Sequence, residues 1–284
     1  MPFKNAYRLS LIAYRKKISF LVAFLIFLLI TSHLSLLSAQ SPAPTPALEK
    51  AQSDYTFQFT KYRDAQEKYI SAKAQYQSFQ TATAKNDAYA KTKDYLIQID
   101  KLYQTYILLV QENGNAINFT KHGDDKNKIN DILKNETNYL NNHIQKINGT
   151  KTLEELPPLS LELKKNLDED FHPKLNKTFA IFEVVETEAA LDDFESLSRI
   201  LDRVVVFKLR AGETKSILNN WSSEIKDIRT KTANSIIKAR DTLSKIPEDQ
   251  ASDGELTNIS QLTQDAKREL KRSKPLFEEA LRII

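Results

Sequence analysis

The composition of the chain limits both its fold and its chemistry. Its 284 residues include only 5 glycines, 9 prolines and no cysteine. So few glycines argue against folds built on glycine-rich phosphate loops or on many tight hairpins. A chain without cysteine has no disulfide, no thiolate metal ligand and no cysteine nucleophile.

The positive charge of the chain is concentrated at its start. The formal net charge is +4, and residues 1–17 hold five basic side chains and no acidic one. Subtracting those five charges leaves −1 for residues 18–284, where both signs are mixed. Because no basic face remains to neutralise phosphates, we expect no nucleic-acid partner.

Residues 18–39 follow this basic leader as an apolar segment. As a helix they would span about 33 Å, enough to cross a bilayer core. The basic leader predicts a single-pass anchor with a cytoplasmic N-terminus and an extracytoplasmic C-terminal region. The anchor residues are Ile18, Phe20, Leu21, Phe24, Leu25, Phe27, Leu28 and Ile30.

Two other interpretations of this segment remain open. It could be a cleaved signal peptide, in which case the rest would be secreted. Cleavage after Ala39 would place the large Leu37 at a position that favours small residues, so we favour the retained anchor. It could also be a buried core helix.

Residues 40–47 (QSPAPTPA) form a proline-rich spacer, expected to be a short, semi-rigid extended stalk. Beyond it, glycines and prolines fall between helically periodic segments. Residues 48–284 are therefore predicted to be all-α, an elongated antiparallel helical bundle with coiled-coil-like packing. A subdivision of this bundle near 153–173 is an open alternative.

The first helix of the bundle carries a heptad seam of aromatic residues. Large rings recur at seven-residue spacing, with Phe79 three residues after the last, and alanines occupy the positions between them. The aromatic seam residues are Tyr55, Tyr62, Tyr69, Tyr76 and Phe79. The alternative function for this stripe is a groove for a glycan or a peptide. Because the phase changes after Phe79, a bend or break is predicted between Thr81 and Asp87.

Further helices are predicted over 124–148, 174–211, 214–246 and from 255 to the C-terminus. Residues 204–207 (VVVF) could form a strand on propensity alone, although they keep the helical phase. Thr152 and Glu155 have the spacing of a capping box. Pro275 predicts a kink in the last helix.

No motif in the sequence predicts catalysis. The four histidines, His33, His122, His143 and His172, lack metal-site spacing and are interpreted as surface or boundary residues. The acidic runs 168–170 and 192–193 are interpreted as solvated helix faces. We therefore expect no enzyme activity, no cofactor and no metal. Six Asn-x-Ser/Thr triplets would be possible glycosylation sites outside the cytoplasm.

These features predict a membrane-anchored extracytoplasmic helical scaffold or protein-interaction protein of the cell envelope, non-catalytic, with a protein partner or self-association. The alternative is a sensory or ligand-binding helical ectodomain. Since a leader of 17 residues is too short for a signalling domain, such an ectodomain would act with a separate signalling partner.

Overall fold

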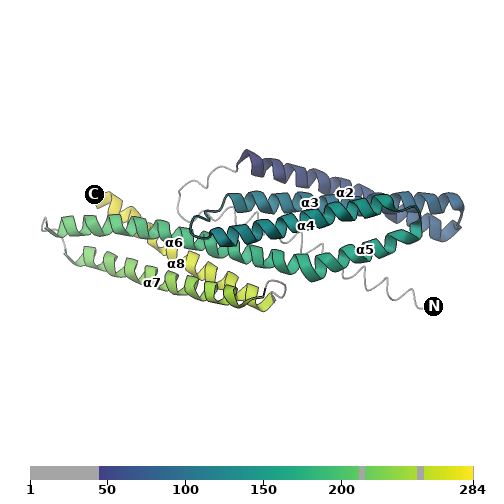
Figure 1. The fold of residues 1–284 in the computed structure, drawn as a ribbon. Helices are drawn as coiled ribbons and strands as arrows, with labels where there is room; N and C mark the ends of the chain where they lie inside the picture. Colours follow the sequence, from purple (N-terminus) through teal and green to yellow (C-terminus); the bar gives the residue numbers. More distant parts are fainter. Residues whose placement is uncertain (1–44, 211–214, 248–252, 284) are drawn as a thin grey trace. The chain divides into compact units, whose positions relative to one another are not determined.

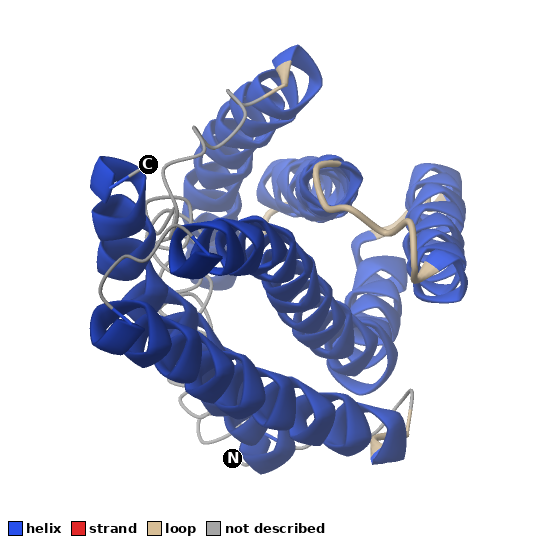
Figure 2. Ribbon diagram, turned by 90° about the vertical axis from the view of Figure 1, so that its left-hand side faces the viewer, coloured by secondary structure: helices blue, strands red, loops and turns tan. Residues whose placement is uncertain are grey.

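The computed structural model describes residues 45–210, 215–247 and 253–283. Within these ranges the chain consists of helices and short loops, without a strand (Figure 2). This confirms the all-α class and the bundle-like packing. The basic leader, the predicted anchor (residues 18–39) and most of the proline-rich spacer lie outside the described residues.

Among the helices of the described part, none is both long and apolar enough to cross a bilayer.

Helices α2 (Pro46–Phe79) and α3 (Ala82–Asn115) pair as a hairpin (Figure 1). Thr45 caps the start of α2, because its hydroxyl accepts a hydrogen bond from the Leu48 amide. The helix breaks at Gln80, just before the predicted interval Thr81–Asp87; Gln80 has φ +49° and donates its amide to the Tyr76 carbonyl. Thr81 then caps α3.

The aromatic seam of α2 faces α3. Tyr55 and Tyr62 are buried, and Tyr69 stacks on Tyr95 of α3 with ring centroids 4.9 Å apart. Because rings of α3 cover Tyr55 and Tyr62, these two residues do not line an open groove. Phe79 is an exception: it is 72% exposed, since α2 ends there and the reversal at Gln80 turns the chain away.

Helix α4 (Gly123–Gly149) packs on α3 and leads through the 3₁₀ turn η1 (Leu153–Glu155) into α5 (Leu156–Lys165). The capping box predicted at η1 forms only in part. Glu155 accepts a hydrogen bond from the Lys151 amide, while Thr152 donates its hydroxyl to Glu155 and caps no amide.

One turn of π-helix, η2 (Asn166–Phe171), joins α5 to α6 (His172–Arg210) without a loop. Helix α6 remains helical through 204–207, so the strand alternative was wrong. It packs with α7 (Lys215–Lys245) and α8 (Asp253–Ile283), and Pro275 lies inside α8. Trp221 of α7 is buried in the apolar core that these helices share.

Candidate functional site

The buried face of α4 carries two ionisable residues. The buried apolar residues of this face are Ile129, Leu133, Leu140 and Ile147, which lie four, seven and seven residues apart. Glu136 and His143 fill the positions that complete this heptad pattern, and their exposed fractions are only 5% and 1%. The spacing that makes α4 amphipathic therefore also brings a carboxyl group and an imidazole into the interior.

The buried imidazole of His143 is fully hydrogen bonded. Its Nδ1 lies 2.8 Å from Oδ2 of Asp100 on α3, and its Nε2 lies 3.0 Å from the Leu159 carbonyl of α5. A carbonyl only accepts, so Nε2 carries a proton. Tyr139 stacks on the ring at 6.0 Å. His143 thus ties three helices together, which corrects its interpretation as a surface or boundary residue.

Burial and the contact with Asp100 have opposite effects on the pKa of His143. Desolvation by itself would lower the pKa of His143, but the hydrogen bond and charge of Asp100 outweigh it and raise that pKa above its usual value. Both side chains are 0% exposed, so no substrate can reach them in this conformation. The pair has the composition of a catalytic dyad but the surroundings of a structural contact.

Glu136 lies beside a cavity. The cavity has a volume of about 460 Å³, is open to solvent on one side, and is lined by residues of α4, η2 and α6. Its lining residues are Lys128, Asp131, Ile132, Asn135, Glu136, Tyr139, Asn166, Asp170, Phe171 and Lys174. The π turn contributes Asn166, Asp170 and Phe171, and π turns are often found at functional sites.

The carboxyl group of Glu136 has an unusually high pKa. Asn166 donates its side-chain amide to Oε1 of Glu136 at 2.8 Å. Burial raises the pKa of Glu136 to about 7, and the nearby Asp170 adds to this effect, while Asn166 and Lys174 oppose it. Glu136 therefore titrates close to neutral pH, which is uncommon for a glutamate.

The acidic runs do not converge on a common point. Asp170 pairs with Lys174 at 2.6 Å, and Asp168 lies 3.8 Å from Nδ1 of His172. Asp192 instead pairs with Lys121. Of these acids only Asp170 contributes to the cavity. In the described part of the chain, no three His, Asp or Glu side chains are grouped so that they could hold a metal.

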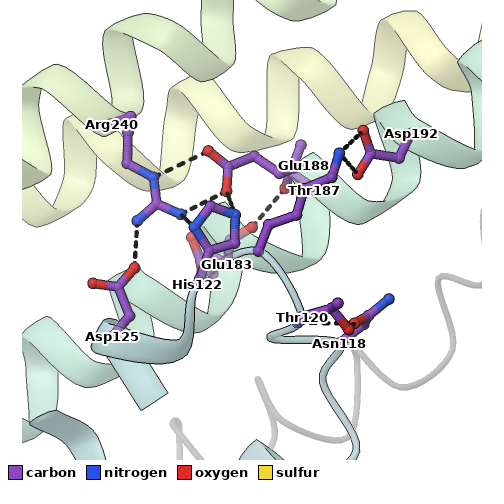
Figure 3. A network of polar contacts seen from close by, with 10 residues as sticks. Asn118, Thr120, His122, Asp125, Glu183, Thr187, Glu188, Asp192 and Arg240 are labelled. Carbon is purple, nitrogen blue, oxygen red and sulfur yellow. Dashed lines mark hydrogen bonds and ion pairs between the residues drawn. The ribbon is translucent and has the colours of Figure 1, made fainter. Parts of the chain in front are cut away.

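A second polar cluster surrounds Arg240 of α7 (Figure 3). Its guanidinium donates to both carboxylate oxygens of Glu188 and, at 2.8 Å, to Asp125. Nδ1 of His122 lies 3.2 Å from the same guanidinium, and its Nε2 lies 2.8 Å from Glu188. Since guanidinium only donates, Nδ1 accepts and Nε2 carries the proton. This cluster joins the start of α4 to α6 and α7, so His122 also has a specific structural partner.

No family model, curated protein or solved structure matches this chain.

Proposed function

We propose that the chain is a membrane-anchored protein of the cell envelope that acts by binding, without catalysis. The observation that carries this proposal is the order of its N-terminal segments: a leader with five basic residues, an apolar run of bilayer length and a proline-rich spacer. In this proposal the helical part lies outside the cytoplasm as an elongated bundle with coiled-coil-like packing.

The partner in this proposal is another protein or a second copy of the chain. The rings of the α2 seam and the core of α6, α7 and α8 already contact residues of this chain, so a partner would use an outer face. Leu197 and Ile200 offer an apolar contact of this kind. They lie three residues apart on α6 and are 40% and 58% exposed.

The absence of cysteine allows a clean test of the topology. Single variants Ser10→Cys in the leader and Ser78→Cys at the exposed end of α2 each introduce one thiol. A membrane-impermeant maleimide should label Ser78→Cys in intact cells and Ser10→Cys only after lysis. Labelling of both or neither in intact cells would contradict the proposed orientation. Release of the full chain by carbonate washing would contradict the anchor.

Cross-linking tests the interaction role. We expect the double variant Leu197→Ser, Ile200→Ser to lose intermolecular cross-links that the unmodified chain forms in its membrane. Ile237→Ser is the matched control, because Ile237 is 65% exposed on α7 without being part of this pair. Equal cross-linking in both variants would exclude the α6 face. Small-angle scattering from a compact monomer would contradict the elongated form.

The cavity beside Glu136 favours a second candidate function, a ligand-binding ectodomain that acts with a separate signalling partner. Pockets between packed helices are common sites for small ligands, and this one combines a buried carboxyl group with aromatic and aliphatic walls. A small molecule that raises the unfolding temperature of the full chain would favour this candidate over the scaffold.

A further inference from the structure

The residues that line the cavity between α4 and η2 include more acidic than basic side chains, and this imbalance indicates a class of ligand. Three of its lining residues are acidic, Asp131, Glu136 and Asp170, while two are basic, Lys128 and Lys174. Lys174 is already paired with Asp170 at 2.6 Å. When Glu136 is ionised, the lining therefore carries one uncompensated negative charge.

That charge belongs to the most buried of the acids. Glu136 is 5% exposed, and the hydrogen bond that it accepts comes from the neutral amide of Asn166. A buried carboxylate is costly unless a cation or several donors compensate it. An anionic ligand would add to this cost, because it would approach three carboxyl groups.

The remaining walls suit a hydrocarbon group. Ile132 lines one part of the cavity, and the rings of Phe171 and Tyr139 line others. Carboxylates combined with aromatic rings are a common means of holding organic cations. A hard divalent ion would need several oxygen ligands, and no three acidic or histidine side chains are grouped for this in the described part of the chain.

We propose that this cavity binds a small organic ammonium ion, with the ammonium group donating to the Glu136 carboxylate and the hydrocarbon part packed between Ile132 and Phe171. This inference rests on the second candidate function, the ligand-binding ectodomain. It goes beyond that function by naming Glu136 as the recognition residue and a primary amine as the ligand class.

The test compares three four-carbon probes on the full chain in a detergent without amino groups. Calorimetry or ligand-observed NMR at pH 8 would measure binding of n-butylamine, 1-butanol and butyrate. We expect butylamine to bind at least about tenfold more tightly than the other two, because a charge-assisted hydrogen bond is worth roughly this factor. Equal binding of butylamine and butanol would overturn the proposal.

Two variants and one control assign the effect to the cavity. Glu136→Gln keeps an oxygen for Asn166 but removes the charge, so it should abolish the preference for the amine. Ile132→Lys places an ammonium group inside the cavity and should block butylamine even if Glu136→Gln folds poorly. Glu169→Gln is the control, since Glu169 is 68% exposed on the same π turn and is not a lining residue. Unchanged amine binding in both cavity variants would refute the assignment.

The outcomes also separate this inference from the function on which it rests. Saturable binding of butanol or butyrate, with no preference for the amine, would support a ligand-binding ectodomain and reject the ammonium site. Binding of none of the three probes would reject the ammonium site, while the unfolding-temperature screen decides the ligand-binding function separately.

Discussion

Replacing Glu136 by glutamine should stabilise the protein at alkaline pH and much less at acid pH. In the folded chain the pKa of Glu136 is about 7, against 4.5 for an ordinary glutamate. Between these values the folded state holds a proton that the unfolded state has released. Stability should therefore fall as pH rises through this window, and the full cost should be present above about pH 7.

The size of the effect follows from the two pKa values. Each pH unit of difference is worth about 1.4 kcal/mol, which sets an upper limit of about 3 kcal/mol. Because the cavity gives the carboxylate partial contact with water, a gain of about 1–3 kcal/mol is expected for Glu136→Gln at pH 8. Near pH 4.5 the two proteins should differ by less than about 0.5 kcal/mol, since glutamic acid and glutamine are nearly isosteric.

Urea denaturation followed by circular dichroism measures this difference. The full chain and the variant would be compared in the same detergent at pH 4.5 and pH 8, so that the titration of other groups cancels. Glu169→Gln should show no comparable change between the two pH values. A difference that is equal at both pH values, or a variant that is less stable at pH 8, would refute the argument from burial.

Three further predictions concern packing, and urea denaturation measures each. Gly114→Ala should destabilise by about 1–3 kcal/mol, because the added Cβ would lie 2.8 Å from Cζ of the Phe182 ring; a neutral result would show that the ring moves aside. Tyr62→Ser should cost about 3–5 kcal/mol and Phe79→Ser less than about 0.5 kcal/mol, since only Tyr62 is buried; equal costs would contradict the seam. Arg240→Met should destabilise the protein by about 1–3 kcal/mol, because Asp125 and Glu188 both lose the guanidinium donor while Glu188 keeps only its contact with His122; an unchanged midpoint would show that the cluster adds nothing.

Helix positions were predictable because apolar periodicity reports burial directly. The tyrosine spacing identified the face on which Tyr55, Tyr62 and Tyr69 contact α3, and it failed at Phe79, where the chain reverses. A bend or break was expected near this point, but the sequence did not predict that the chain would reverse in so short a turn. Gln80 adopts the left-handed conformation that usually requires glycine, so no glycine or proline marked a hairpin.

The candidate site was not predicted, because polar residues were assigned to surfaces by their type. Glu136 and His143 occupy buried heptad positions of α4, and the spacing of Ile129, Leu133 and Leu140 around them was the available signal. Their partners could not be found in this way. Asp100 lies 43 residues from His143, and Asn166 lies 30 residues from Glu136, so only the tertiary fold brings them together.

The reversal at Gln80 has a practical consequence for work on this protein. Gln80 is exposed and, together with Thr81, makes up the whole connection between the two helices. An epitope inserted between Gln80 and Thr81 would therefore lengthen a turn without entering the α2–α3 interface, and longer surface connections cost little. Such an insertion offers a binding site for antibodies that leaves both chain termini unaltered.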